Sequence, residues 1–225
     1  MILFDSVIKR YGRNFTAVSD ISLKIEAGEF VFLVGPSGAG KTTLLRLLNR
    51  EIIPTSGSVF VMDWEVNKLP KTKIPFLRRI VGFVFQDFKL LPDRTVGENI
   101  AVSLEILNKN NTEIRDRIKD VLQIIRLEDK LNFFPSQLSL GEQQRVAIGR
   151  AIAGQTKILL ADEPTGNLDP KTSWEILKII NNINKEGTTV IMATHNVDIV
   201  NSLKKRVVVL NKGKIIRDEK KSKYS

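Results

Sequence analysis

Eight consecutive residues, Gly35 to Thr42, combine glycines, a lysine and a hydroxyl in the pattern G-x-x-x-x-G-K-[ST]. The glycines let backbone N–H groups converge on phosphate oxygens, and a helix that begins here adds positive potential. In such a loop Lys41 reaches the β- and γ-phosphates of a nucleotide, and the Thr42 hydroxyl binds Mg²⁺. The candidate phosphate-binding residues are Gly35, Pro36, Ser37, Gly38, Ala39, Gly40, Lys41, Thr42 and Thr43.

A second site candidate is a pair of adjacent acids, Asp162 and Glu163, that ends the apolar segment 158–161. Acids at the carboxyl end of a strand lie at the ligand-binding crevice of an open α/β sheet. Asp162 is therefore predicted to bind Mg²⁺, directly or through water. Glu163 is predicted to polarise an attacking water, a role worth roughly 10² to 10⁴ in rate. An Asp-Glu pair alone is usually a solvated strand end, and the phosphate loop is what favours the catalytic interpretation.

The segments around these motifs predict the elements that position them. Phe30–Val34 precedes the loop and is apolar, which favours a buried strand, and the segment 43–48 after the loop favours a helix. A strand, a glycine loop and a helix in this order are the context in which the pattern binds phosphate. The other expected strands span 3–8, 21–25, 59–61, 81–85, 158–161, 188–193 and 207–210, and the other expected helices span 114–125, 174–183 and 197–203, with one more from about Ser139.

This order of elements predicts an α/β fold with a mostly parallel sheet. Strands with one helix fill the first 62 residues, and residues 88–153 are helical in character. After residue 153 strands and helices alternate again. We therefore expect a single domain over residues 1–225, with a core made of 1–87 and 154–225 and an inserted helical subdomain at 88–153.

The composition sets outer limits on the protein. The chain has 225 residues and no cysteine, so no disulfide framework is possible. No apolar run approaches the roughly 18 to 20 residues that span a bilayer. Residues 1–9 lack the long apolar stretch of a secretory signal. We expect a chain with no transmembrane segment of its own, which is compatible with the cytosol.

The formal net charge of +10 is concentrated in two regions. Residues 201–225 carry nine Lys and Arg against two acids, and residues 66–79 carry five against none. Such regions attract anionic lipid headgroups or nucleic acid. Near an anionic leaflet each cation contributes about 1 kcal/mol. For residues 214–225 a solvated, solubilising tail is an equally good interpretation.

Five further segments extend the motifs over essentially the whole chain. They are Tyr11, Gln86, the run Leu-Ser-Leu-Gly-Glu-Gln-Gln-Arg at 138–145, Gly-Asn-Leu-Asp at 166–169, and His195, the only histidine. Alone, each has a simpler interpretation: Tyr11 and His195 as packing residues, and Ser139 with Glu142 as a helix cap. Together and in this order, with the phosphate loop and the Asp-Glu pair, they resemble the ATP-binding-cassette ATPases.

This resemblance implies a P-loop NTPase fold with an N-terminal antiparallel β part, and Mg²⁺-dependent hydrolysis of ATP. In that family the residue that matches Tyr11 stacks on adenine, and the one that matches Gln86 touches Mg²⁺. The match of His195 is a switch histidine. The resemblance thus implies the catalytic residues Glu163, His195 and Lys41, and the metal ligands Thr42, Gln86 and Asp162.

The resemblance also implies that one chain cannot complete a site. Family members use the residues that match Ser139, Gly141 and Glu142 to bind the γ-phosphate held by a second copy, and Asp169 matches a loop that contacts that copy. ATP binding is therefore expected to close a homodimer with two shared sites. Leu140 departs from the family pattern, which has glycine there, and a side chain at this turn is expected to crowd the closed dimer.

Segments 75–92, 94–99 and 161–169 narrow the resemblance to the branch of the family that acts in bacterial cell division. This branch implies an integral membrane protein as partner, and a location on the cytoplasmic face of the cell membrane at the division site. The alternative is the ATPase of a lipoprotein-releasing or macrolide-type exporter, which shares nearly all of these motifs. A soluble cassette that acts on DNA or ribosomes is disfavoured, because the chain has neither a long coiled-coil insertion nor two cassettes.

Overall fold

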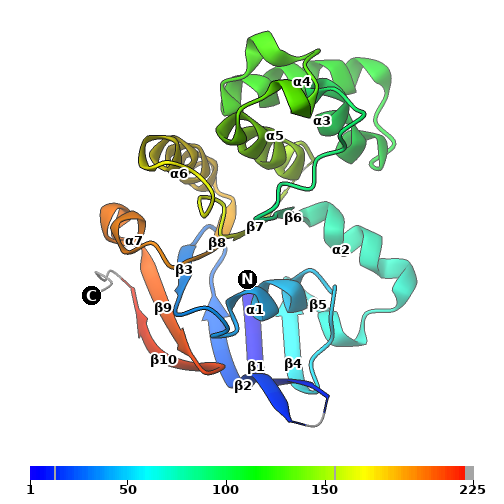
Figure 1. Ribbon diagram of the computed structural model, residues 1–225. Helices are drawn as coiled ribbons and strands as arrows, with labels where there is room; N and C mark the ends of the chain where they lie inside the picture. The colour runs from blue at the N-terminus through cyan, green and yellow to red at the C-terminus, as the bar shows by residue number, and fades with distance from the viewer. Residues whose placement is uncertain (13, 155, 221–225) are drawn as a thin grey trace.

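The computed structural model describes residues 1–12, 14–154 and 156–220. The end of the basic C-terminal region, 221–225, lies outside the described residues. Two β-sheets and helix α1 (Lys41–Leu48) make up the lower part of the molecule in Figure 1. Above them lie helices α3 (Val96–Glu105), α4 (Asn111–Ile125) and α5 (Leu140–Ile152). The helical segment expected after residue 88 therefore forms one separate layer.

The larger sheet has six strands in the order β10-β9-β3-β8-β7-β6. Neighbouring strands are parallel from β9 through β3, β8 and β7 to β6. The edge strand β10 is antiparallel to β9. Parallel pairing puts the carboxyl ends of these strands at one edge of the sheet. The strands span Phe30–Val34 (β3), Val81–Val84 (β6), Ile158–Asp162 (β7), Thr189–Thr194 (β8), Arg206–Asn211 (β9) and Lys214–Glu219 (β10).

The smaller sheet is antiparallel and has the strand order β2-β1-β4-β5. Its strands are β1 (Ile2–Tyr11), β2 (Phe15–Ile25), β4 (Ser56–Val61) and β5 (Trp64–Glu65). A cluster of buried side chains from both sheets and α1 fills the space between them. The smaller sheet thus braces the phosphate loop and α1 from one side.

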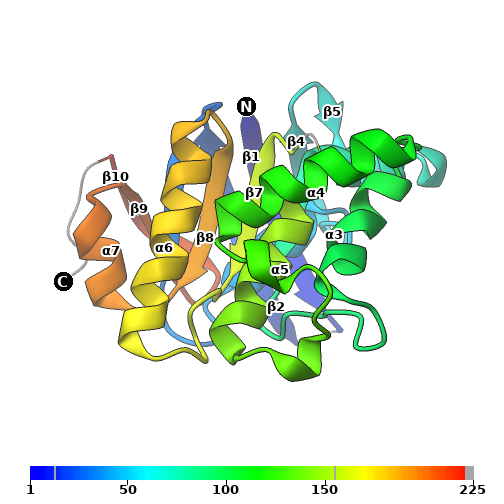
Figure 2. The same ribbon diagram turned by 90° about the horizontal axis from the view of Figure 1, so that it is seen from above.

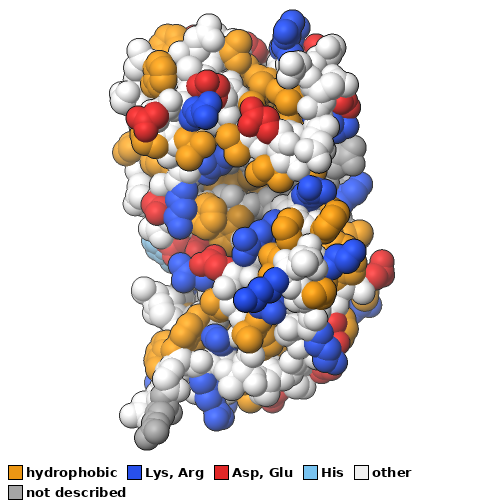
Figure 3. Space-filling view, turned by 90° about the vertical axis from the view of Figure 1, so that its right-hand side faces the viewer, with side chains coloured by type: hydrophobic (Ala, Val, Ile, Leu, Met, Phe, Trp, Pro, Cys, Tyr) orange, Lys and Arg blue, Asp and Glu red, His pale blue; other side chains and the backbone are white. Residues whose placement is uncertain are grey.

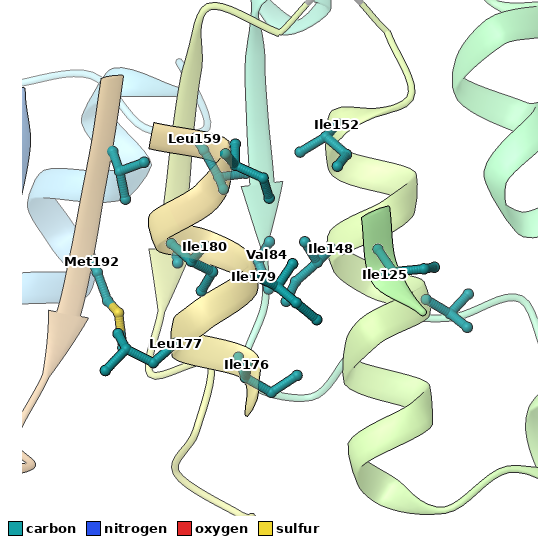
Figure 4. Close-up of a cluster of buried hydrophobic side chains, with 14 of the residues drawn as sticks. Val84, Ile125, Ile148, Ile152, Leu159, Ile176, Leu177, Ile179, Ile180 and Met192 are labelled. Carbon is teal, nitrogen blue, oxygen red and sulfur yellow. The ribbon is translucent and has the colours of Figure 1, made fainter. Parts of the chain in front are cut away.

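Helices cover the other face of the six-stranded sheet. Figure 2 shows α5 and α6 (Pro170–Lys185) side by side over it, with α7 (Val197–Leu203) at one end. Figure 4 shows the apolar side chains between them, with Ile148 of α5, Ile176 and Ile180 of α6, and Val84 and Leu159 of the sheet. This cluster joins the helical layer to the parallel sheet.

The α/β architecture expected from the sequence is confirmed, and the structure adds elements outside the expected strands and helices, among them one helix with an internal proline and one edge strand. Helix α2 (Ile74–Ile80) forms although Pro75 lies inside it, because proline in the first turn removes no intrahelical hydrogen bond. Strand β10 forms at the sheet edge from a charged segment, as edge strands commonly do. The domain boundaries at 87/88 and 153/154 stay predictions.

The helical layer contacts the sheet closely at Gly82 of β6. A Cβ at Gly82 would clash with the carbonyl oxygen of Ala151 near the end of α5, and would lie 3.0 Å from Cγ2 of Thr156. The Lys157 N–H also donates to the Ile80 carbonyl at 2.9 Å. Backbone meets backbone here, so a side chain has no room.

We expect Gly82→Ala to lower the free energy of unfolding by about 1–3 kcal/mol, the usual cost of overpacking a rigid contact. Gly154→Ala is the matched control, because its Cβ would lie 3.2 Å from the flexible end of Leu107 and at an ordinary contact distance of 3.8 Å from the Arg79 carbonyl oxygen. Urea unfolding of both variants measures the difference. An unchanged midpoint for Gly82→Ala would show that α5 shifts freely on the sheet.

Candidate active site

The phosphate loop leaves the carboxyl end of β3 and leads directly into α1. Gly35 (φ +146°) and Gly40 (φ +106°) have backbone conformations that side chains rarely adopt. A Cβ at Gly35 would clash with the Leu210 carbonyl oxygen, and one at Gly40 would lie 2.6 Å from that of Ala17. No side chain caps α1, so its first N–H groups are available to an anion. The loop has the form of a phosphate cradle.

Lys41 is buried within this cradle, with 5% of its surface exposed. Its ammonium donates to the carbonyls of Gly35 at 2.8 Å and Pro36 at 3.2 Å. It also lies 3.7 Å from Oε1 of Glu163. The positive charge of Lys41 is therefore held between the backbone carbonyls of the loop and the carboxylate of Glu163.

Thr42 and Asp162 meet across the carboxyl edge of the sheet. The Thr42 hydroxyl donates to Oδ1 of Asp162 at 3.0 Å. Burial raises the pKa of the Asp162 carboxyl, the Thr42 hydrogen bond opposes this, and the charge of Glu163 adds to it. The ionised Asp162 carboxylate is poorly solvated and lies beside the Thr42 hydroxyl oxygen. Two such oxygen ligands can bind a hard cation such as Mg²⁺. Among the described residues no group of three His, Asp or Glu could hold a metal, so an ion here would need phosphate or water ligands as well.

Glu163 lies at the centre of the site in a constrained conformation. Its backbone has φ +47°, uncommon for a residue with a side chain, and its N–H donates to the Ala193 carbonyl at 3.0 Å. Oε2 lies 2.9 Å from Nδ1 of His195, and the carboxylate is mostly buried. Lys41 and His195 thus flank the Glu163 carboxylate from the segments that follow two neighbouring strands, β3 and β8.

Gln86 borders the same region, whereas Asp169 caps a helix. A Cβ at Gly166 would lie 3.5 Å from Oε2 of Glu163 and 3.6 Å from Nε2 of Gln86, so the two side chains border the same glycine. Asp169 is the N-cap of α6 and accepts from the Thr172 N–H at 3.0 Å, and hydrogen bonds with Thr172 lower its pKa. The six residues that the structure brings together are Lys41, Thr42, Gln86, Asp162, Glu163 and His195.

The predicted signature residues lie elsewhere, at the start of α5. The capping box predicted for Ser139 and Glu142 is confirmed: the Ser139 hydroxyl accepts from the Glu142 N–H at 3.3 Å and donates to its carboxylate at 2.9 Å. A hydrogen bond from the Ser139 backbone lowers the pKa of Glu142. A Cβ at Gly141 would clash with Thr172, so helices α5 and α6 touch here. Within the described chain, Ser139 forms no hydrogen bond with the phosphate loop.

Two large side chains singled out from the sequence, Leu140 and Tyr11, are exposed. Leu140 is 53% exposed at the first turn of α5, so its side chain projects to solvent rather than into the helix layer. Tyr11 is 40% exposed at the end of β1, and its ring stacks on that of Phe15 with centroids 6.3 Å apart. Because Ala17 of the same hairpin touches Gly40, the aromatic pair lies near the phosphate loop.

Arg150 is a residue of the site region that sequence reasoning missed. Its guanidinium donates to the carbonyls of Lys89 at 2.6 Å and Phe88 at 2.8 Å, just after Gln86. Phe88 (φ +57°) and Lys89 (φ +48°) are both left-handed, and burial lowers the pKa of Arg150. The arginine therefore holds a strained loop from α5. Positive φ values at these residues leave no signal in the sequence.

Known proteins match this chain along its length. The sequence pattern of the ABC transporter family matches residues 18–166. "Cell division ATP-binding protein FtsE" of Streptococcus pneumoniae is 49% identical over 97% of this chain and 95% of its own length, and the protein of that name from Mycobacterium tuberculosis is 49% identical over 100% and 98%. The dimeric ATP-binding cassette MJ0796, solved in a post-hydrolysis state with ADP and Pi, superposes with a TM-score of 0.89 at 36% identity and covers 98% of both chains.

We expect Asp162→Asn to stabilise the nucleotide-free protein. Because burial raises the pKa of Asp162, ionisation of this carboxyl costs folding free energy. The cost grows as the pH rises from the ordinary pKa of aspartate through the raised one, and it is complete at neutral pH. Asparagine keeps an acceptor for Thr42 without the charge, and each 1 kcal/mol gained raises the melting temperature by about 2–4 °C.

Thermal unfolding at neutral pH and at pH 4 measures this effect, which should shrink at the lower pH. The control is Asp63→Asn, since Asp63 is an exposed acid in the turn between β4 and β5. A lower melting temperature for Asp162→Asn at neutral pH would refute the argument.

Proposed function

Because this chain belongs to the ABC transporter family and is an ATPase, we propose that it is the ATP-hydrolysing subunit of a membrane complex that acts in bacterial cell division. The observation that carries the proposal is the division of the site. Glu163, Lys41 and His195 converge on the phosphate loop, whereas the signature turn at Ser139 does not contact it. A site divided in this way is completed by a second copy.

The half-site of one chain would act through three side chains. The Glu163 carboxylate accepts the proton of the attacking water, since it is the acid held beside the loop. His195 Nδ1 fixes Oε2 of that carboxylate at 2.9 Å, which leaves Oε1 to meet the water. Lys41 lies 3.7 Å from Oε1 and supplies positive charge where phosphate oxygens gather.

The oxygen donors at the sheet edge fit a Mg²⁺ ion. Thr42 Oγ1 and the Asp162 carboxylate are 3.0 Å apart, and burial makes the ionised carboxylate receptive to a cation. We assign these two residues, with Gln86, as the groups that would hold it. The ion would neutralise charge on the bound phosphates when present.

A second copy would complete the site in a defined way. Ser139, Gly141 and Glu142 lie at the N-terminus of α5, the end of a helix whose positive potential favours an anion. In a two-fold dimer this turn faces the γ-phosphate on the partner's loop, and Asp169 lies at the same interface. ATP then favours the closed dimer and hydrolysis releases it, which is differential binding to two states.

The test of this function is size-exclusion chromatography of Glu163→Gln. With Mg²⁺ and ATP this variant should elute as a dimer, because glutamine cannot accept the water's proton and the nucleotide persists. Without ATP it should elute as a monomer. Adding Ser139→Arg to Glu163→Gln should abolish the dimer but keep ATP bound to the loop. A monomer under all conditions would remove the shared-site proposal.

A groove beside α2 offers a place for the membrane partner. It has a volume of about 400 Å³ and lies between α2 and β6 on one side and the helical layer on the other. Figure 3 shows this face hollowed, with Lys and Arg side chains around apolar ones. Its lining includes Phe85, which precedes Gln86, and Arg150, which holds the loop after it. A partner segment in the groove would therefore bear on the hydrolysis site.

We propose an integral membrane protein of the FtsX type as this partner, and the cytoplasmic face of the membrane at the division site as the location. The two named cell-division relatives support this choice over the exporter alternative. No helix among the described residues is long and apolar enough to cross a membrane. A partner that co-purifies from membranes and has four spans with one large extracellular loop would support division, and a lipoprotein-handling permease would support export.

We expect Ile106→Glu to reduce co-purification of the membrane partner at least tenfold. Ile106 lines the groove and is 57% exposed. A glutamate there would remove the apolar contact with the partner, and its charge would stay in solvent rather than in the core. The matched control is Ile216→Glu, because Ile216 is 62% exposed on the edge strand β10. Equal recovery of the partner with both variants would place the docking surface elsewhere.

A further inference from the structure

The segment 66–79 forms a basic surface beside the groove. It consists of Lys68, Lys71, Lys73, Arg78 and Arg79 and runs through two short 3₁₀ turns into α2. The segment itself contains no acid. Among the described residues, Glu65 alone forms an ion pair with this surface, at 2.9 Å from Lys68. Four positive charges therefore remain without a counter-charge.

No acid among the described residues neutralises these four charges. Lys71 and Lys73 are exposed and form no ion pair among the described residues. Arg78 donates to the Asn49 carbonyl at 3.2 Å, and Arg79 donates to the Ile106 carbonyl at 3.0 Å. Carbonyls are neutral, so these bonds fix the two guanidinium groups without cancelling their charge. The surface is thus both ordered and available to an anion.

An exposed aromatic ring lies among these cations. Phe76 is 44% exposed, with Nζ of Lys73 5.3 Å and Cζ of Arg79 4.8 Å from its ring centroid. Aromatic rings flanked by Lys and Arg are typical of the membrane interface, where the ring enters the headgroup region and the cations meet phosphates. The combination suits a bilayer surface better than a purely charged groove would.

We propose that this basic surface binds anionic lipid headgroups, with Phe76 inserted at their level, beside the docked membrane partner. The placement follows from continuity, because Pro75, Arg78 and Arg79 also line the groove assigned to that partner. The lipid contact adds to the proposed function, and the orientation of the protein on the membrane rests on that function. The contact itself can be tested on the isolated chain.

The experiment is sedimentation of the full chain with vesicles of phosphatidylglycerol and phosphatidylcholine, or of phosphatidylcholine alone. The protein should sediment with the anionic vesicles only, and less so as salt rises. The double variant Lys71→Glu/Lys73→Glu should bind at least about 30-fold more weakly, the factor that two cations of about 1 kcal/mol each give. Phe76→Ala should weaken binding further when added.

The matched control is Lys178→Glu/Lys185→Glu, which makes the same charge change on α6. Both lysines are exposed, and neither forms an ion pair within the described residues. The C-terminal basic region is present in every protein compared, so the difference between the two double variants isolates the basic surface. The control should bind anionic vesicles within a few-fold of the unchanged chain.

Three outcomes would overturn the proposal. Equal vesicle binding by the two double variants would show that only net charge matters. Tighter binding to duplex DNA than to vesicles, lost in Lys71→Glu/Lys73→Glu, would assign the surface to nucleic acid. Unchanged vesicle binding by that variant, with loss of the membrane partner in detergent, would assign it to an acidic protein segment. Failure of Glu163→Gln to dimerise would leave the lipid result untouched.

Discussion

Parallel pairing of β3, β8, β7 and β6 is the constraint on which the site depends. Because all four strands run the same way, the chain leaves each one at the same edge of the sheet. The phosphate loop, His195, the acids Asp162 and Glu163, and Gln86 follow those four exits in turn. Residues 120 positions apart are thereby held within hydrogen-bonding range, as the 3.0 Å contact between Thr42 and Asp162 shows.

Helix α5 connects this edge to the rest of the molecule. Its N-terminal end carries the signature residues, with Leu140 exposed, and its last turn carries Arg150, which holds the loop after Gln86. Immediately beyond, Ala151 abuts Gly82 of the sheet. A helix that touches the proposed dimer interface, a strained loop and the groove proposed for the partner can transmit a shift from any one of them to the others. Its packing against α6 therefore bears on function as well as stability.

Charge is used in two opposite ways in this chain. At the sheet edge, Lys41 is buried and Asp162 is partly buried, and desolvation raises the pKa of the Asp162 carboxyl. On α2 and the turns before it, Lys71 and Lys73 are solvated and uncompensated. The buried charges serve a small ligand at short range. The exposed ones suit a large anionic surface, where many weak contacts add up.

The sequence alone determined the fold class, the phosphate loop, the strand-end acids and the cap at Ser139, because each follows from local periodicity or from neighbouring residue types. It also indicated Tyr11 and Gln86, through a resemblance rather than through local physics. Only the tertiary structure decided that Arg150 holds the loop after Gln86. Likewise, only packing shows that Leu140 projects to solvent, and that Glu163 has a positive φ beside Lys41. These features depend on contacts between distant segments and on backbone angles imposed by packing, and neither leaves a pattern in the order of residues.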